Sequence, residues 1–578
     1  MPRDSTPSPT PSTPSTPSTP STPSTLSADR VAKYRERVLS ERDALLRALE
    51  SPHDAQHRVL TSMLAANAQT SFGVEHDFKN IHSWKDFRTA VPIRNYDALA
   101  PWIDRAAAGE ANVLSADDPV VYFMSSGSTG DSKQIPITRE FMRTGFFPPF
   151  YSAWANFVEH FPDVISREDS TLNLKHDPIS RTATTVSGRP HLGASQVDFG
   201  AAFGEPLSAE PGFWAPWGTL PVPVGDTDYL EKAYLRLRLA VEHDVRCLIG
   251  INPALVAAVP YQLDRWWPRI VKELRDGTLG GQPHGSPNPE RAAELERLAG
   301  YFGTLRPAHV WPNFKLIFCW TTGLASLYLP RLKESFGNDV TVLPAPVAAS
   351  EGFVGVALDR HPTACSLAVT AAFHEFADAD TDLGADSATM LFDELVPGRE
   401  YHVVLSHVGG LYRYALGDVV RVIDLKYGVP RVCYAGRSNL SNVAGERLRE
   451  SHVVRALEAA LGAQGLEVHN ATCRPVAPAG TTARYEFALA PRGSVDERES
   501  ESLLTCLDSA LRGLSADYES ARANQRLARP VLHLLAEDAF LQEWEARVAS
   551  GIRPAQVKDR VFQRDDEAWE RLLSCPAT

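Results

Sequence analysis

Residues Ser125 to Lys133 are nearly all small or hydroxylated and read Ser-Ser-Gly-Ser-Thr-Gly-Asp-Ser-Lys. They follow Val121-Tyr122-Phe123, a β-branched and aromatic triplet that is typical of a short buried strand. Glycines permit left-handed turns, so several backbone N–H groups can point into one concavity, and Lys133 adds a positive charge. A flexible Ser/Gly linker is the alternative, but the apolar residues on both sides favour a cradle for phosphate groups.

The cradle is not a Walker loop. Ser132 stands five residues after Gly127, where that motif needs glycine, and Gln134 follows the lysine in place of a Mg²⁺-binding Ser or Thr. The segment therefore predicts a different kind of phosphate site.

Two later carboxylates lie in segments that could also bind a nucleotide. Glu351, in Ala-Ala-Ser-Glu-Gly, follows an expected strand and could hold Mg²⁺, which prefers oxygen ligands. The tripeptide Ser-Glu-Gly is common, however, and alone would indicate no site. Asp418 lies in a segment from Gly409 to Val420 that is interpreted as a hairpin turn. Its two acceptor oxygens could bind two sugar hydroxyls, or the residue could be purely structural.

Strand and helix patterns alternate in the middle of the chain. Three apolar runs predict strands at Val245–Gly250, Lys315–Trp320 and Val340–Leu343, and the patterns between them predict helices at Pro253–Trp266 and Leu327–Phe336. This alternation indicates an α/β sheet, in which ligands gather at the carboxyl ends of the strands.

Length and composition describe a globular enzyme. The 578 residues exceed one ordinary core, and 43% hydrophobic with 22% charged residues is the balance of a folded chain. A net charge of −13 argues against nucleic acid or an anionic membrane as the main partner. No apolar run approaches the ~18 residues of a membrane span, and the N-terminus lacks a signal-peptide core. Seven scattered cysteines without a CxxC pair favour a reducing, cytoplasmic location.

Residues 1–26 form a separate region. Pro-Ser-Thr repeats five times from Pro11 to Thr25 with nothing apolar to bury, which predicts a disordered tail. A glycosylated stalk is the alternative, but nothing else in the chain points to secretion. The first helix is expected to begin near Ser27.

Aromatic residues cluster among prolines and glycines after the cradle, in Phe146–Tyr151 and Gly212–Gly218. Such residues are either core or the wall of a cavity. We expect Phe150, Trp214 and Trp217 to form an apolar wall around a substrate.

The order of these motifs resembles the adenylate-forming superfamily, and most closely the plant auxin- and jasmonate-conjugating acyl acid amido synthetases and their bacterial relatives. The similarity covers most of residues 57 to 450 and thins beyond. The segments that carry it are SSGSTGDSKQIPIT (Ser125–Thr138), WTTG (Trp320–Gly323), ASEGF (Ala349–Phe353), FHEF (Phe373–Phe376) and GLYRYALGDVVRV (Gly410–Val422).

The resemblance implies a role for each matching residue. Glu351 would bind Mg²⁺, Lys133 would neutralise phosphate charge, and Gly323 would lie at the substrate. The expected nucleotide contacts are Ser125, Ser126, Gly127, Ser128, Thr129 and Gly130 at the phosphates, Ser350 at the α-phosphate, Asp418 at the ribose and Arg437 before a hinge.

Two positions depart from the family pattern, and a third matches it only loosely. Val347 stands where the family usually has an aromatic residue against adenine. Arg447 stands where bacterial relatives have a lysine; it keeps the charge but replaces a compact ammonium with a planar fork. Lys558 matches the closing basic motif loosely, so either basic residue could serve the first step of the reaction.

The resemblance implies an α/β fold with a large adenylating domain at residues 27–437 and a smaller, mobile α+β domain at 438–578. We expect ATP-dependent adenylation of a small-molecule carboxylic acid with Mg²⁺, then transfer of the acyl group to an amine or amino acid. A thioester ligase acting on coenzyme A or a carrier protein, and a catalytically inactive binding module, are the alternatives.

Overall fold

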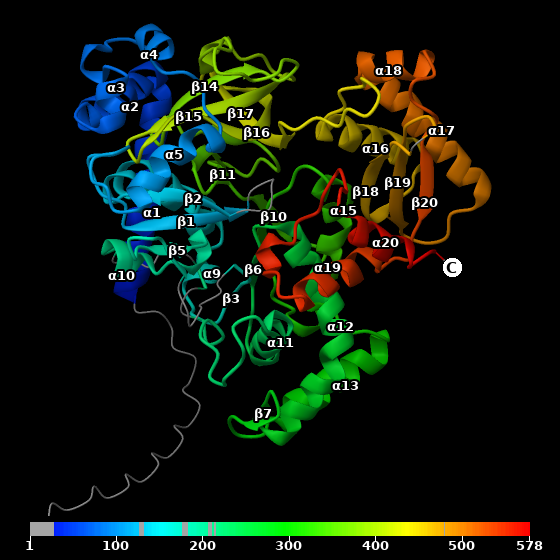
Figure 1. The fold of residues 1–578 in the computed structure, drawn as a ribbon. Helices are drawn as coiled ribbons and strands as arrows, with labels where there is room; N and C mark the ends of the chain where they lie inside the picture. The colour runs from blue at the N-terminus through cyan, green and yellow to red at the C-terminus, as the bar shows by residue number, and fades with distance from the viewer. Residues whose placement is uncertain are drawn as a thin grey trace, which may run out of the picture.

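The computed structural model describes residues 28–126, 132–175, 183–205, 211–212, 215–478 and 480–577. A large N-terminal part, blue to yellow in Figure 1, carries most of the chain, and a smaller C-terminal part in orange and red lies beside it. Within the described ranges, no helix combines the length and the apolar character that a membrane crossing requires.

The described chain begins with two helices, α1 (Ala28–Glu50) and α2 (Pro52–Asn67). Val38, Leu45 and Leu49 of α1 are buried on the face that the helical spacing predicts. Pro52 occupies the first turn of α2, where its missing N–H removes no helical hydrogen bond. The helix predicted to begin near Ser27 is confirmed, and α2 packs on the edge strand β14 (Phe373–Asp378).

The three strands that the alternating pattern predicts form a parallel sheet together with a fourth, β3, that it did not predict, in the order β10-β9-β6-β3. Their bounds are Thr341–Pro344, Leu316–Cys319, Cys247–Ile249 and Thr171–Asn173. The surrounding helices are α11 (Tyr229–Ala240), α12 (Pro253–Asp276), α13 (Pro289–Phe302) and α15 (Ala325–Leu332). The α/β prediction is confirmed, and α12 continues past the predicted end at Trp266.

The Ser/Gly segment connects two strands of a second sheet. Antiparallel strands β1 (Val121–Ser126) and β2 (Ser132–Ile137) pair from Val121 opposite Ile137 to Ser126 opposite Ser132. The short strands β5 (Pro190–Leu192) and β4 (Ala183–Thr184) complete the order β2-β1-β5-β4. The predicted cradle residues Gly127, Ser128, Thr129 and Gly130 lie outside the described residues.

The third sheet is antiparallel throughout and has the order β11-β12-β13-β17-β16-β15-β14. The strands not yet given are β11 (Val347–Ala349), β12 (Gly352–Val356), β13 (Cys365–Leu367), β15 (Glu400–His407), β16 (Leu411–Lys426) and β17 (Val429–Arg437). The predicted hairpin turn at Gly417-Asp418 is wrong. Gly417, with φ of 81°, lies inside the single long strand β16, and the turn follows at Tyr427-Gly428.

A buried ion pair fixes the start of β16. Arg413 Nε lies 2.9 Å from Glu375 Oε2 of β14, and each side chain is 1% exposed. Arg413 also donates to the carbonyl of Val91 at 2.8 Å and to the hydroxyl of Thr389 at 3.1 Å. Its φ of 44° lies in the left-handed region, a conformation that costs a non-glycine residue roughly 1–3 kcal/mol and needs such surrounding contacts.

The C-terminal part holds its own sheet, β18-β19-β20, with α16 and α17 against it (Figure 1). The strands are β18 (Val468–Val476), β19 (Arg484–Pro491) and β20 (Val531–Leu534). The helices are α16 (Glu450–Gln464), α17 (Glu497–Leu514), α18 (Ala516–Ala523) and α20 (Asp566–Leu573). Helix α19 (Ala539–Ala549) instead packs back on α11 and α12 of the large part.

Breaking the buried pair of Arg413 should destabilise the large part of the protein. Glu375→Leu leaves a guanidinium buried without its carboxylate, which costs roughly 3–5 kcal/mol. We expect thermal unfolding to begin several degrees lower. Arg143→Gln is the control, because it removes an ion pair to Glu140 whose arginine is 70% exposed, and such pairs contribute roughly 0–1 kcal/mol. Equal effects of the two substitutions would contradict a structural role for the buried pair.

Candidate nucleotide and catalytic site

Three side chains from different strands or turns meet at one point: Lys133, Glu351 and Tyr414. Lys133, on β2, has its Nζ 3.8 Å from Glu351 Oε1 and 3.3 Å from the Tyr414 hydroxyl. That hydroxyl lies 3.2 Å from the same Glu351 oxygen, to which it donates. Glu351 lies in the tight turn between β11 and β12, and its side chain is 5% exposed.

Asp418 and Arg437 face each other across β16 and β17. They are register partners, and Arg437 Nη1 lies 2.7 Å from Asp418 Oδ1. This ion pair holds the buried oxygen Oδ1 of Asp418 against the guanidinium. The backbone N–H of Arg437 donates to Glu450 Oε2 at 3.0 Å, which fixes the end of the strand.

Lys558 reaches this site from the C-terminal part of the chain. Its Nζ lies 4.7 Å above the ring of Trp320, at the carboxyl end of β9. The residues on each side are anchored: Asn252 donates to the carbonyl of Val557 at 2.7 Å, and Tyr328 donates to Asp559 at 2.6 Å. Contacts with the large part therefore hold the lysine in place.

The charges of the site perturb one another. Burial raises the pKa of the Glu351 carboxyl, and the ammonium of Lys133 opposes this shift. Burial also raises the pKa of Asp418, against the pull of Arg437, Lys558 and Lys133. Enclosure of the ammonium lowers the pKa of Lys558, and Arg437 lowers it further, although the side chain still reaches solvent. Shifted pKa values of this kind are frequent at functional sites.

Glu351 could contribute a ligand to a divalent cation but not a complete coordination shell. Among the described residues, no three His, Cys, Asp or Glu side chains come together as a metal cluster. Mg²⁺ is usually held by one or two carboxylates together with phosphate oxygens and water. The single buried carboxylate beside Lys133 fits a cation that arrives with a phosphorylated substrate.

The structure brings five sequence-predicted residues together: Lys133, Glu351, Asp418, Arg437 and Lys558. Ser350, half-buried, is the neighbour of Glu351 in the same turn. Gly323 follows β9 with φ of 68° and open space around it. Ser125 and Ser126 end β1, but nothing is described of their side chains.

Arg447 is not part of this cluster. Its guanidinium pairs with Asp382, with distances of 2.9 Å and 3.1 Å to the two carboxylate oxygens, and this carboxylate is 80% exposed. This arrangement does not support a role for Arg447 in the first reaction step, because its guanidinium is paired with Asp382 outside the cluster.

The predicted aromatic wall is buried core where it is described. Phe150 is 7% exposed and stacks with Phe146, and Trp217 is 1% exposed in a separate cluster around α11 and α12. Trp214 lies outside the described residues. Phe150 and Trp217 have almost no free surface for a ligand, so their role as a substrate wall stays an unsupported prediction.

Three histidines near the sheet are structural. His374, His402 and His407 each bond a backbone carbonyl through Nε2, at 2.9 Å, 3.0 Å and 2.9 Å. Burial lowers the pKa of His374 to about 4 and that of His407 to about 3, so both are neutral at pH 7. These bonds leave no histidine of this group in position as a general base.

Sequence reasoning missed two aromatic residues of the site, Tyr414 and Tyr96. Tyr96 accepts from the backbone N–H of Gln134 at 2.8 Å, and its ring lies 5.5 Å from Lys133 Nζ. Tyr414 was visible four residues before Asp418, a spacing that puts both side chains on one face of a strand. The hairpin interpretation of this segment concealed that signal.

Models of one protein family match almost the whole described chain. The GH3 family N-terminal domain matches residues 42–341, the GH3 family central domain residues 365–437, and the GH3 family C-terminal domain residues 451–567. The chain belongs to the GH3 family. The site of this GH3 protein draws Lys133 from the first of these segments, Asp418 and Arg437 from the second, and Lys558 from the third.

Several named GH3 relatives are similar to this chain over most of their length. A probable indole-3-acetic acid-amido synthetase of Oryza sativa subsp. japonica is 25% identical over 561 residues, which cover 87% of this chain and 90% of the relative. The jasmonoyl–L-amino acid synthetase JAR4 of Nicotiana attenuata is 23% identical, with 87% and 90% covered. The AtGH3.15 acyl acid amido synthetase, solved in complex with 2,4-DB, shares the fold with a TM-score of 0.75 at 19% identity, over 93% of this chain and 96% of that chain.

Burial of Glu351 predicts that its charge destabilises the ligand-free GH3 protein. A carboxyl whose pKa is raised in the folded state costs stability at neutral pH, and this cost disappears as the pH falls through the raised pKa. Glu351→Gln should therefore raise the melting temperature at pH 7.5 without nucleotide or Mg²⁺, and the gain should shrink toward pH 4.5. The exposed Glu140→Gln should show no such gain. A lower melting temperature for Glu351→Gln at pH 7.5 would show that the pairing with Lys133 outweighs burial.

Proposed function

We propose that this GH3 protein is an ATP-dependent ligase that adenylates a carboxylic acid and transfers the acyl group to an amine or amino acid, forming an amide. The observation that carries the proposal is the convergence of Lys133, Glu351, Asp418 and Lys558 in a chain that matches the family along three successive segments. Amide formation is favoured over a thioester because several similar proteins are named amido synthetases.

The nucleotide would lie between β1–β2 and β16. Lys133, next to the Ser/Gly connection, supplies positive charge at the phosphates, and Ser350 supplies a hydroxyl at the α-phosphate. The carboxylate of Asp418 accepts from a ribose hydroxyl, and its ion pair with Arg437 holds it in place. The site thus has positive charge where the phosphates would lie and a hydrogen-bond acceptor where the ribose would lie, which matches the arrangement of these groups in ATP.

Glu351 would hold Mg²⁺ together with phosphate oxygens. The cation, when bound, neutralises charge on the phosphates during attack. The hydroxyl of Tyr414 holds the Glu351 carboxylate toward Lys133, which orients one oxygen and leaves the other for the metal.

The reaction has two chemical steps, adenylation of the acid and transfer of the acyl group. A carboxylate oxygen of the acid attacks the α-phosphorus of ATP, an O–P bond forms, and pyrophosphate leaves. The amine then attacks the acyl carbon, a C–N bond forms, AMP leaves with the electron pair, and the amine loses a proton. Alignment and charge neutralisation supply most of the rate in such reactions.

The acid and the amine are small molecules by this proposal. The relatives named above act on indole-3-acetic acid and on jasmonic acid with amino acids, and an organic acid with an apolar body is the corresponding substrate class here. We propose a cytoplasmic location, which the seven free cysteines of the described chain support.

Removing the metal or phosphate contacts should stop the first step. In ATP–pyrophosphate exchange, measured with a panel of acids, Glu351→Ala should lose Mg²⁺-dependent exchange and Lys133→Ala should slow it about 10²–10³-fold, the usual effect of one aimed charged donor. Wild-type exchange with at least one acid distinguishes the ligase from an inactive binding module. Near-normal exchange in both variants would overturn the assignment of these residues.

Lys558 should serve adenylation and not acyl transfer. With Lys558→Ala, acid plus ATP should yield little acyl-adenylate, whereas preformed acyl-adenylate plus amine should still give amide, because only the first step needs charge at the departing pyrophosphate. Arg447→Ala is the matched control and should affect neither half-reaction, since Arg447 pairs with Asp382 away from the cluster. Loss of both half-reactions in Lys558→Ala, or loss of adenylation in Arg447→Ala, would contradict this division of roles.

A further inference from the structure

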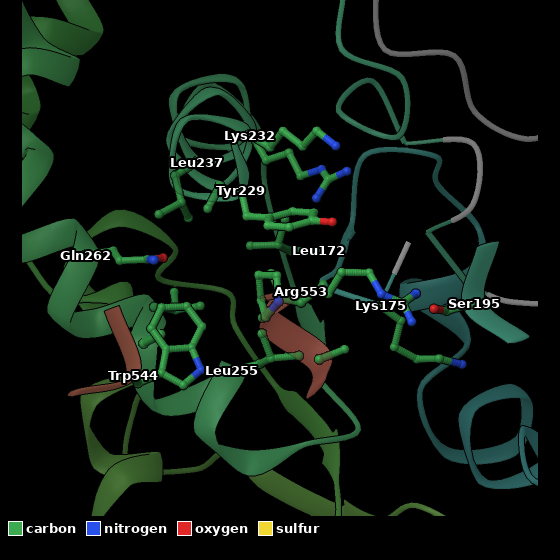
Figure 2. A pocket seen from close by; sticks show the side chains of 17 residues that line it. Leu172, Lys175, Ser195, Tyr229, Lys232, Leu237, Leu255, Gln262, Trp544 and Arg553 are labelled. Atoms are coloured by element: carbon green, nitrogen blue, oxygen red, sulfur yellow. The ribbon is translucent and has the colours of Figure 1, made fainter. Parts of the chain in front are cut away.

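A cavity lies between the large part and the C-terminal part of the chain, away from the residues of the nucleotide site. Its floor is apolar and is formed by Leu172 of β3, Leu237 of α11 and Leu255 of α12. The C-terminal part closes it with Trp544 of α19 and the segment Arg553–Ala555. Figure 2 shows these side chains converging from both parts on one space.

Every charged side chain that lines this cavity is cationic. The four are Lys175, Lys232, Arg236 and Arg553, and no aspartate or glutamate is among the described residues that line it. These cations have contacts within the protein, such as the 2.7 Å bond from Lys232 to the carbonyl of Asp226. The lining is thus cationic in a chain whose net charge is −13.

Two buried donors in the lining have no hydrogen-bond partner among the described residues. They are Gln262 Nε2 and Trp544 Nε1, and both side chains are 5% exposed. A buried donor without an acceptor costs roughly 1–3 kcal/mol, so proteins rarely retain one that nothing satisfies. In Figure 2 the Gln262 amide and the Trp544 indole both lie at the edge of the cavity.

We infer that this interdomain cavity is a binding site for a small amphipathic organic anion. The apolar body of the anion would lie on the leucine floor, and its acidic group would lie at the cationic residues and the two unpaired donors. An apolar floor excludes an inorganic ion as the best occupant, because a bare anion would lose its hydration against hydrocarbon. Cations and unpaired donors equally disfavour an uncharged hydrocarbon. The inference goes beyond the proposed ligase activity and does not depend on it.

Both parts of the chain contribute contacts to the occupant. The leucine floor and Gln262 belong to the large part, whereas Trp544 and Arg553 belong to the C-terminal part. A ligand held by both therefore stabilises this relative position of the two parts, since it binds only where all of its contacts are present.

The test uses full-length protein without nucleotide, and octanoate as the probe, titrated by calorimetry. We expect one octanoate per chain, and at least about 10-fold weaker binding for 1-octanol, which has the same body without the charge. Gln262→Leu should weaken octanoate binding about 10-fold while the free protein keeps or gains thermal stability, because the substitution removes an unsatisfied buried amide. Arg236→Gln should weaken binding similarly.

Two controls separate this site from its surroundings. Lys272→Gln changes a 76% exposed cation on the same helix α12 and should leave octanoate binding unchanged. Asp418→Asn alters the nucleotide site and should also leave it unchanged. Binding that is lost in Asp418→Asn but kept in Gln262→Leu would place octanoate in the nucleotide site and overturn the inference. Equal affinity for octanol, or no binding of octanoate at millimolar concentration, would overturn it as well.

Discussion

The ion pair between Arg413 and Glu375 is the contact on which the site depends most. It fixes a residue with a left-handed backbone at the irregular start of β16, where the pairing with β15 shifts between Leu405 and His407. The next residue is Tyr414, whose hydroxyl bridges Lys133 and Glu351. A buried pair of this kind contributes little net stability, but removal of one partner is costly, so it specifies one geometry of the strand.

The same strand then carries Asp418 into the candidate nucleotide site. The site therefore concentrates two mostly buried carboxylates and three more exposed cations, and desolvation disfavours the charged forms of Glu351, Asp418 and Lys558. Such an arrangement is expensive for the ligand-free protein and becomes favourable once a polyphosphate and a divalent cation complete the charges. Enzymes commonly accept this cost, because preorganised charge needs no rearrangement during reaction.

One short segment of the C-terminal part joins the two sites. Arg553 lines the interdomain cavity, and Lys558, a few residues further along, reaches the nucleotide site. Val557, between them, is held by Asn252 at the start of α12, the helix that also carries Gln262. A ligand in the cavity would thus stabilise the segment that presents Lys558, which links occupancy of one site to the geometry of the other without a further moving part.

The sequence alone determined the fold class, the family resemblance and the charged residues of the candidate site, but not its tyrosines Tyr96 and Tyr414. Local patterns suffice for these features: alternating apolar runs specify the parallel strands, and short motifs specify Lys133, Glu351 and Asp418. Tertiary structure decided which residues meet. Only the fold shows that Lys558 rather than Arg447 approaches the site, that Trp217 is core, and that Gln262 and Trp544 leave two donors unpaired at a shared cavity. These outcomes depend on contacts between residues hundreds of positions apart, and no local pattern encodes the partner of a side chain at that distance.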